Sequence, residues 1–206
     1  KVLEDSKVDA IINTTPDHWH APLTCMALEA GKHVYVEKPC SHNPWEGEQL
    51  VAFQNKYSDK VVQMGNQQRS ALESQEIIKE IHNGAIGEVY HAVAFYNNNR
   101  PEMDTPKQVA VPEGFDWELF QGPAPRRPYL DVFFDYNWHW FWEFGTSETG
   151  NNAVHELDIA RWALGVRYPD HVSAVAGKFH FDDEWETYDT MLATFKFGDK
   201  SIVWDG

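Results

Sequence analysis

The most informative residues of the chain are Glu37, Lys38 and Pro39, which follow a short apolar run, His33–Val36. A second apolar run, Val8–Thr14, leads directly into the polar sequence TPDHWH. Ligands of open α/β sheets bind at the carboxyl ends of the strands, so both runs would direct polar residues into one crevice. A lysine in that crevice can stabilise a developing negative charge. We therefore predict that Lys38 lies in an active site.

Strands and helices alternate in the first 69 residues, and this order predicts the fold class. The predicted elements are strands at Val8–Thr14, His33–Val36 and Lys60–Met64, with one helix after the first strand and another at Pro44–Tyr57. In the first helix, Pro22 is expected in the first turn, where a missing N–H costs nothing, and Gly31 marks the end. Short connections between these elements predict a parallel, doubly wound α/β sheet over residues 1–69.

The pattern changes after residue 69. The predicted elements are helices at 70–84 and Asn151–Leu164, and strands at Glu88–Tyr96, Val172–Phe181, Tyr188–Phe197 and Lys200–Trp204. About forty residues rich in Pro, Asn and aromatic side chains follow the first of these strands, which is a length typical of a functional or substrate-covering segment. Strands without intervening helices predict a second, α+β domain over residues 70–206, with a mainly antiparallel open sheet.

The formal net charge of the 206 residues is -15, and residues 70–206 contribute most of it, with 10 Lys and Arg against 23 Asp and Glu. A surface this acidic repels phosphate backbones and anionic lipids, so nucleic-acid and membrane partners are not expected. It also disfavours a strongly anionic substrate. A hydrophobic content of 42% is sufficient for a globular core.

Cys25 and Cys40 are the two cysteines of the sequence, too few for a disulfide framework or a four-ligand zinc site. Cys40 could be a reactive thiol beside Lys38, although a small packed residue is the better explanation. His18 and His20 lack the helical spacing of a metalloprotease motif, so no metal site is predicted.

Five segments, in chain order, resemble the glucose-fructose oxidoreductase / inositol dehydrogenase / rhizopine-catabolism (Gfo/Idh/MocA) family: DAIINTTPDHWHAP, GKHVYVEKP, MGNQQR, NGAIGEV and GNNAVHELDIARW. The resemblance covers essentially the whole chain. It implies a Rossmann domain that binds NAD or NADP, followed by an α+β domain whose sheet forms the floor of a sugar or polyol site. Because no GxGxxG occurs, we expect the chain to be an inactive fragment that lacks both ends of such a protein.

The resemblance also assigns roles to individual residues. Lys38 and His155 match the catalytic lysine and histidine of the family. The residues that would hold the cofactor are Asp17, His18, Trp19, His20, Glu37, Lys38 and Asn66. The family often has an aspartate four residues before the histidine, where this chain has Asn151 and therefore no carboxylate for a proton relay.

Oxidation of an alcohol by hydride transfer requires a base for the hydroxyl proton and a cation near the oxygen. Lys38 can supply the cation. Histidine titrates near neutral pH, so His155 is our first choice for the acid/base. Lys38 remains an alternative base, because a positive nicotinamide ring disfavours the charged form of a nearby lysine.

Helical spacing places His155 on a polar stripe of the predicted helix. That stripe is Asn151, His155, Asp158 and Trp162, and the apolar stripe is Ala153, Leu157, Ala160 and Leu164. The apolar stripe would face the core, and Asp158 could orient the imidazole. The predicted substrate-binding residues are Tyr96, Trp138, His139, Asn151 and Asp158, whereas ordinary packing would account for most other aromatic residues at 129–144.

We predict an NAD(P)-dependent oxidoreductase that acts on a hydroxyl of a neutral sugar or polyol. One alternative is a glycosidase that transiently oxidises C3 of a glycoside with bound NAD, because the TPDHWH, EK and GN spacing also resembles that branch of the family. Another is a non-catalytic sugar- or nucleotide-sensing protein of the same fold. The open sheet would allow a homo-oligomer. A cytoplasmic and a periplasmic location both stay open.

Overall fold

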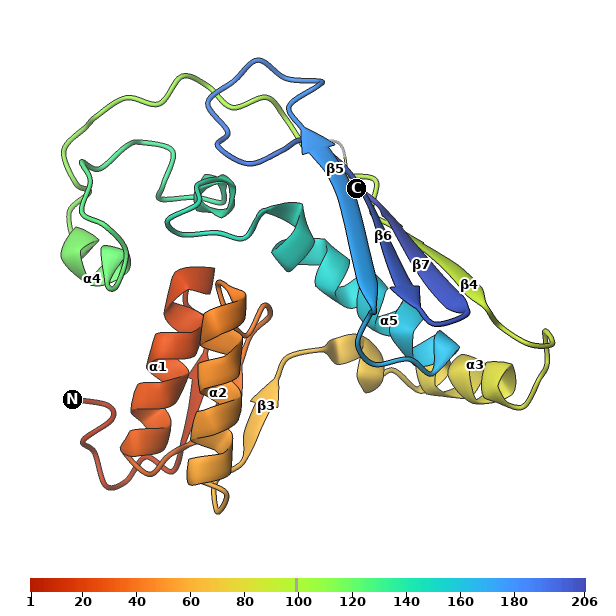
Figure 1. Cartoon of the computed structure of the whole chain (residues 1–206). Coiled ribbons are helices and arrows are strands. Elements are labelled where there is room, and N and C mark those ends of the chain that lie inside the picture. The colour runs from red at the N-terminus through yellow and green to blue at the C-terminus, as the bar shows by residue number, and fades with distance from the viewer. Residues whose placement is uncertain (99) are drawn as a thin grey trace. The chain divides into compact units, whose positions relative to one another are not determined.

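The computed structural model describes residues 1–98 and 100–206, and the chain divides into two compact units. The first unit comprises Lys1–Gly65, Met103–Gly150 and Glu184–Glu186, and the second comprises Asn66–Glu102, Asn151–Asp183 and Thr187–Gly206. Figure 1 labels the main elements of both. The division into domains at residues 1–69 and 70–206 stays a prediction from the sequence.

A parallel sheet in the order β1-β2-β3 forms the centre of the first unit (Figure 1). The strands are β1 (Ala10–Asn13), β2 (His33–Val36) and β3 (Val62–Met64), and the crossover helices are α1 (Asp17–Glu29) and α2 (Pro44–Lys56). Ala27, Leu28, Val34 and Val36 form the buried core between sheet and helices. The predicted parallel α/β arrangement is confirmed, and β2 has the bounds that its apolar run indicated.

The start of α1 differs from the prediction. The helix begins at Asp17, so Pro22 is its sixth residue and does not lie in the first turn. Proline has no N–H to donate to the carbonyl of His18, four residues earlier. The early start has a local cause, because Pro16 precedes the helix and Asp17 supplies an acidic residue in its first turn.

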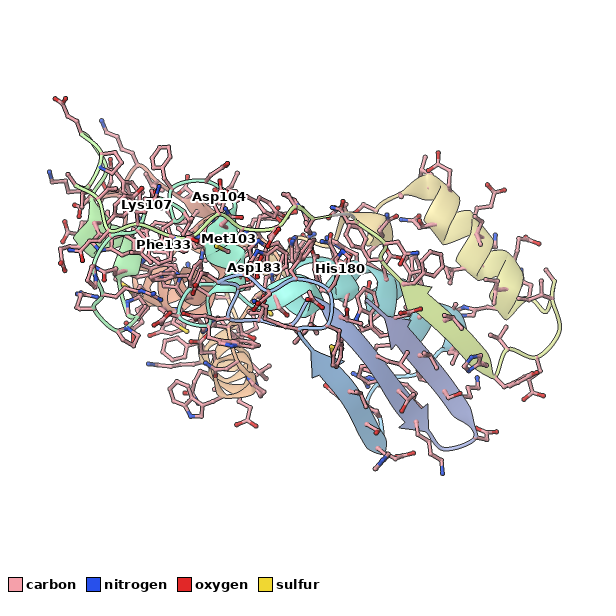
Figure 2. The ribbon with its side chains drawn as sticks, turned by 90° about the horizontal axis from the view of Figure 1, so that it is seen from above. Met103, Asp104, Lys107, Phe133, His180 and Asp183 are labelled. Carbon is pink, nitrogen blue, oxygen red and sulfur yellow. The ribbon has the colours of Figure 1, made fainter. Side chains whose placement is uncertain are left out.

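Segment 103–150 belongs to the first unit and contains little regular structure, with α4 (Trp117–Gln121) and a 3-10 turn at Asn137–Trp140. Its side chains instead form a second core, which Figure 2 shows around the labelled Met103 and Phe133. The buried members are Met103, Trp117, Tyr129, Val132, Phe133, Trp140, Phe141, Phe144 and Trp185. We call this set the aromatic cluster. The expectation that most of these rings serve packing is confirmed.

The second unit contains a four-stranded sheet in the order β4-β7-β6-β5 (Figure 1). The strands are β4 (His91–Phe95), β5 (His171–Gly177), β6 (Thr190–Phe197) and β7 (Lys200–Asp205). Its helices are the 3-10 turn Gln67–Arg69, α3 (Leu72–His82) and α5 (Val154–Leu164), the last preceded by a π-helical turn at Thr149–Ala153. Among the described strands of this sheet, β4 and β7 pair in parallel and the other two pairs are antiparallel, so the predicted mainly antiparallel sheet is confirmed.

Helix α5 packs on this sheet through the predicted apolar stripe. Ala153, Ala160 and Leu164 are buried, and Leu157 packs against them. On the sheet side, Ala193, Ile202 and Trp204 complete this core. Among residues 1–98 and 100–206, no helix has the length and apolar character that crossing a bilayer requires.

Phe133 is the central ring of the aromatic cluster. It is fully buried, stacks on Trp117 with centroids 5.4 Å apart, and meets Phe141 and Phe144 edge to face at 4.8 and 5.2 Å. We expect Phe133→Ala to lower the free energy of unfolding by about 3–5 kcal/mol, because it leaves a cavity in this core. The matched control is Phe134→Ala, since Phe134 is 63% exposed and should cost less than about 1 kcal/mol. If Phe133→Ala and Phe134→Ala lowered the free energy of unfolding in urea by the same amount, the central role of Phe133 would be contradicted.

The loop between β5 and β6 is organised by Asp189, and His180 of this loop is labelled in Figure 2. The Asp189 carboxylate accepts hydrogen bonds from the N–H groups of Phe179, His180 and Phe181 at 3.0 Å, and from the Thr190 hydroxyl at 2.8 Å. Burial raises the pKa of Asp189, but these four hydrogen bonds outweigh it and lower the pKa from 3.8 to about 2.

This carboxylate should make the stability of the second unit depend on pH. Because the pKa of the folded state lies below that of the unfolded state, the contribution is present above 3.8 and is lost as the pH falls through about 2. We expect Asp189→Asn to cost about 1–2 kcal/mol near neutral pH and clearly less at about pH 3. Urea unfolding at both pH values measures the difference. The control is Asp182→Asn, because Asp182 lies in the same loop but is exposed. If Asp189→Asn lowered the free energy of unfolding equally at both pH values, the role given to the Asp189 carboxylate would be refuted.

Candidate active site

The carboxyl ends of β1 and β2 bring Asn13 and Glu37 together. Asn13 pairs in register with Val36, and the Glu37 N–H donates to the Asn13 carbonyl oxygen at 2.9 Å. Lys38 follows, half-buried, and its backbone N–H donates to Glu37 Oε2 at 3.3 Å. The parallel register therefore places Glu37 and Lys38 at the edge of the sheet where ligands bind in this fold class.

Asp17, the first residue of α1, is a buried carboxylate with only 3% of its surface exposed. The Thr146 hydroxyl donates to Asp17 Oδ2 at 2.6 Å. Burial raises the pKa of Asp17 above its usual 3.8, and the Thr146 hydrogen bond and the nearby His20, Lys38 and His42 offset this only in part. The Thr146 hydroxyl thus holds the Asp17 carboxylate at the start of α1.

Two histidines of α1, His18 and His20, are buried against backbone carbonyls. His20 Nδ1 donates to the Pro39 oxygen at 2.6 Å, which leaves Nε2 as an acceptor, and this atom has no hydrogen-bond partner among the described residues. His18 Nε2 lies 2.8 Å from the Phe120 oxygen and Nδ1 lies 3.3 Å from the Phe144 oxygen. Burial lowers the pKa of His18 despite these two contacts, so the neutral ring donates through one nitrogen only.

Trp19 borders a cavity together with Thr15 and Pro16 of the same TPDHWH motif. Its indole N–H donates to the carbonyl oxygens of Leu119 and Phe120 at 2.9 and 3.1 Å. The cavity has a volume of about 400 Å³, and its lining includes Thr15, Pro16, Leu23, Phe115, Leu119 and Phe120. Most of this lining is apolar, which suits a flat ring better than a charged group.

Trp138 and His139 lie beside the aromatic cluster. The His139 ring stacks on Trp138 at 3.6 Å and on Tyr136 at 4.2 Å between centroids, and its Nδ1 donates to the Tyr136 carbonyl oxygen at 2.7 Å. His139 is buried and Trp138 is half-buried. Both side chains therefore have structural partners, and their contact with a substrate stays a prediction.

Cys40 packs against the core of the parallel sheet. Burial raises the pKa of its thiol, so the thiol is protonated at neutral pH and is a weak nucleophile. This environment supports the packing role that the sequence favoured. Within the described part of the chain, no group of three or more His, Cys, Asp or Glu side chains is arranged to hold a metal ion.

In the second unit, Asp158 of α5 anchors two side chains from the segment that follows β3. Arg69 Nε and Nη2 donate to the two oxygens of Asp158 at 2.7 Å each, and Asn66 Nδ2 donates to Oδ2 at 2.8 Å. The Arg69 guanidinium also lies 4.4 Å above the Trp162 ring. A bidentate pair with this geometry fixes the carboxylate in place.

Asn66 connects this anchor to His155. Because the Asn66 amide nitrogen donates to Asp158, its Oδ1 faces His155 Nδ1, at 3.5 Å, the outer limit of a hydrogen bond. An oxygen there accepts from Nδ1–H and leaves Nε2 as the unprotonated nitrogen of the neutral ring. Asp158 is therefore connected to the imidazole through Asn66, which is consistent with the orienting role that the sequence suggested for Asp158.

Asn151 and Tyr96 also belong to the second unit. Asn151 is buried, with 3% of its surface exposed. Tyr96 is half-buried against the core beneath α5, its N–H donates to the Asp205 oxygen at 3.2 Å, and its hydroxyl accepts from Asn98 at 3.4 Å. Their roles toward a substrate, like the pairing of Lys38 with His155, stay predictions.

The sequence did not single out two residues that the structure makes prominent, Thr146 and Arg69. Arg69 lies three residues after Asn66 in the MGNQQR segment. Its closeness in sequence to a predicted site residue could have marked it as a candidate site residue. Thr146 lies in an irregular segment 129 positions after Asp17, and no periodicity or motif indicated that the two side chains meet.

The role of Asn66 and Asp158 can be tested on the imidazole itself. We expect Asp158→Asn to release the Asn66 amide, so that His155 populates both neutral tautomers and not only the one with Nδ1–H. Nitrogen-15 chemical shifts of the His155 ring report the tautomer directly. Glu156→Gln, in the same helix, should leave these shifts unchanged. A single, unaltered tautomer in Asp158→Asn would show that the Asn66 contact does not govern the ring.

Comparison with known proteins adds to this geometry. A model of an oxidoreductase family with an NAD-binding Rossmann fold matches residues 1–66, and the GFO/IDH/MocA C-terminal domain matches residues 74–204. D-glucoside 3-dehydrogenase from Escherichia coli is 34% identical over 215 residues, covering 96% of this chain and 51% of that relative. A glycosyl hydrolase family 109 protein from a Shewanella species is 30% identical over 96 residues, covering 47% of the chain and 21% of the relative.

A solved structure shows the same fold. The aldose-aldose oxidoreductase from Caulobacter crescentus, complexed with glycerol, superposes with a TM-score of 0.72 at 20% identity, covering 100% of this chain and 52% of that one. The chain therefore spans about half the length of the dehydrogenase and of the oxidoreductase that it matches.

Proposed function

The chain belongs to the Gfo/Idh/MocA oxidoreductase family, and we propose that the protein transfers a hydride between a nicotinamide dinucleotide and a hydroxyl of a neutral sugar or polyol. The observation that carries this proposal is Lys38 at the carboxyl edge of a parallel sheet, directly after Glu37, whose N–H donates to the Asn13 carbonyl oxygen of the neighbouring strand. A fixed cation at this edge can stabilise the charge that develops on a reacting oxygen. The similarity to a D-glucoside 3-dehydrogenase supports the choice of a sugar hydroxyl.

The first unit offers groups that fit the nicotinamide half of NAD or NADP. Trp19 and Glu37 are half-buried, so they would be able to contact the cofactor, whereas Asp17 and His18 are buried and would support these contacts from behind. The unpartnered Nε2 of His20 suits an amide or hydroxyl donor. The cofactor, when bound, would supply the hydride acceptor. Asn66, from the second unit, remains a proposed cofactor contact.

We assign the proton chemistry to His155 and the charge stabilisation to Lys38. The Asn66 contact favours the tautomer in which Nε2 is the unprotonated nitrogen, and an unprotonated nitrogen can accept a hydroxyl proton. Lys38 would meet the negative charge on the oxygen as that proton leaves. Both roles require that the two side chains reach the same substrate oxygen, which is the central assumption of the proposal.

The proposed substrate is uncharged, because the net charge of -15 disfavours anions near the protein. Trp138 and Tyr96 could stack on the apolar face of a sugar ring, and His139, Asn151 and Asp158 have polar atoms suited to hydroxyl groups. The half-buried Trp138 and Tyr96 can contribute a ring face without leaving their cores. The Asp158 carboxylate already accepts hydrogen bonds from Arg69 and Asn66. It would therefore bind a substrate hydroxyl only through the remaining lone pairs of its oxygens.

We also propose that the open face of the β4-β7-β6-β5 sheet mediates self-association. Its register places Val93, Phe95, Val175 and Leu192 on the face opposite the core residues Ala94 and Ala193, and all four are at least half exposed. Exposed apolar groups concentrated on one face are typical of an interface. Light scattering of the purified protein tests this, and a monomer at all concentrations would end the proposal.

Absorbance of the reduced dinucleotide tests the activity. We expect a full-length protein that contains this chain to reduce NAD or NADP with at least one member of a panel of neutral sugars, polyols and glycosides. Lys38→Ala and His155→Ala should each lower kcat/KM by about 100-fold or more. The matched controls, Lys56→Ala on the surface of α2 and His171→Ala on the surface of β5, should retain full activity. Activity that survives in both site variants would refute the assignment.

A second candidate function is supported by the similarity to a glycosyl hydrolase family 109 protein, which covers 47% of the chain. Such an enzyme would oxidise a glycoside transiently, release the aglycone and reduce the sugar again with the same cofactor. It would therefore release aglycone without a net change in absorbance of the reduced dinucleotide. A sensor of the same fold would show neither signal, and its response to ligand would survive in Lys38→Ala and His155→Ala.

A further inference from the structure

We infer that His20 is a positioning residue for Lys38: its Nδ1–H holds the carbonyl group of Pro39, the residue after Lys38, and thereby fixes the backbone that carries the lysine. The inference deepens the proposed function, and its consequence for catalysis rests on that function. The hydrogen bond itself does not, because it joins two residues of the first unit. In this role His20 acts through Pro39 and touches no reacting atom, and only 2% of its surface is exposed.

The hydrogen bond from His20 to Pro39 is short, and its direction is fixed. Nδ1 lies 2.6 Å from the Pro39 carbonyl oxygen, slightly closer than is usual for an N–H···O bond. A carbonyl oxygen can only accept, so Nδ1 carries the proton in this contact. Nε2 has no hydrogen-bond partner among the described residues that would turn the imidazole another way. The described hydrogen bond of the imidazole therefore ends on the loop that carries Lys38.

The residue before Lys38 is held by strand β1. The Glu37 N–H donates to the Asn13 carbonyl oxygen at 2.9 Å, which continues the pairing of β1 with β2 by one residue. Lys38 is thus preceded by a backbone hydrogen bond to β1 and followed by a hydrogen bond from α1. Because both of its neighbours are held, the backbone of Lys38 has little conformational freedom left.

The side chain of Asn13 connects these two attachments. Its amide nitrogen donates to the His20 carbonyl oxygen at 3.0 Å, so its Oδ1 accepts from the Thr15 hydroxyl, at 2.7 Å. Asn13 is 1% exposed, and loss of either bond would leave a buried polar group unsatisfied. The hydrogen bonds therefore form a closed cycle that runs from Asn13 through residues 37–39 to His20 and back to Asn13.

This cycle bears on catalysis because of the nature of a lysine side chain. The ammonium of Lys38 is a point charge on a flexible four-carbon stem, so its position depends on where the backbone is held. Misplacement of a reacting group by about 1 Å can lower the rate about 100-fold. We therefore expect the Nδ1 contact of His20 to affect turnover more than the binding of sugar.

Two amide substitutions at position 20 separate the two nitrogens of the imidazole. The amide nitrogen of asparagine is as many bonds from the backbone as Nδ1, whereas that of glutamine is as many bonds away as Nε2. His20→Asn should therefore keep the bond to Pro39, and His20→Gln should lose it. Both variants bury the same amide group, and glutamine fills the space of the imidazole better, so a purely structural role would favour glutamine.

Amide hydrogen exchange of Glu37 reports the cycle without an enzymatic assay, in a full-length protein that contains this chain. We expect His20→Gln to speed exchange of the Glu37 N–H by about tenfold or more, and His20→Asn by less than about threefold. The internal reference is the Val34 N–H, which lies in the same strand and donates to the Val61 oxygen at 2.9 Å. Its exchange should be equal in both variants, because it lies outside the cycle.

Controls separate the loss of one hydrogen bond from a loss of structure. His171→Gln, on the exposed surface of β5, should change neither exchange rate. Thermal unfolding shows whether each variant is folded. If His20→Gln is not, nitrogen-15 shifts of the His20 ring in the unaltered protein decide, because the inference requires the proton on Nδ1. Equal exchange of Glu37 in the two folded variants, or an unprotonated Nδ1, overturns the inference.

The same pair of variants connects the cycle to turnover. If the full-length protein reduces a dinucleotide with a sugar, kcat at saturating dinucleotide should fall about 10- to 100-fold in His20→Gln and less than about threefold in His20→Asn. The KM for the sugar should stay within about threefold in both, since the contact acts on Lys38 and not on binding. A lower kcat in His20→Asn than in His20→Gln would overturn the inference.

The outcome for His20 can be told apart from the outcome for the proposed function. Failure to reduce either dinucleotide with any substrate would refute the proposed function alone. The exchange rate of Glu37 and the nitrogen-15 shifts of His20 would still confirm or overturn the hydrogen bond to Pro39, because neither measurement needs a substrate or a cofactor.

Discussion

The polar beginning of α1 can be buried only because distant parts of the chain satisfy its hydrogen bonds. An unpaired carboxylate or imidazole in this position would cost several kcal/mol. Thr146 supplies the donor for Asp17, and the carbonyl oxygens of Phe120 and Phe144 lie against the His18 ring. The segment that supplies these groups is itself irregular, so it depends on the aromatic cluster for its shape. Packing around Phe144 and the burial of Asp17 and His18 are therefore parts of one arrangement.

Much of the fold could be predicted from local patterns. The run His33–Val36 has the bounds of β2, and the three-and-four spacing of Ala153, Leu157, Ala160 and Leu164 identified the face of α5 that is buried. Such patterns succeed because strand and helix periodicity decide burial directly. Pro22 shows where they fail, because a proline can also lie inside a helix that starts earlier, here at Asp17 directly after Pro16. Asp17–His20 form the first turn, and these polar residues have partners that the local sequence does not show.

The candidate site could be predicted as a set of residue types but not as a set of contacts. Lys38 follows a strand, and its position at the edge of the sheet follows from parallel pairing alone. The partners of Asp17 and Asp158 come from segments 129 and 89 positions away, and no spacing rule connects residues so far apart. Asp158 illustrates the consequence: the sequence suggested that it orients His155, but it did not indicate that Arg69 and Asn66 donate to its carboxylate.

The two units hold their polar site residues by different physical means. In the second unit, Asn66 transmits the orientation of Asp158 to His155 as a hydrogen-bond direction, which selects a tautomer and requires no net charge at the ring. In the first unit, the Thr146 hydroxyl donates to the buried Asp17 carboxylate and offsets part of the effect of burial on its pKa. An imidazole that must accept a proton gains nothing from being held as a cation, so support by the direction of a hydrogen bond matches the chemistry that we assign to His155.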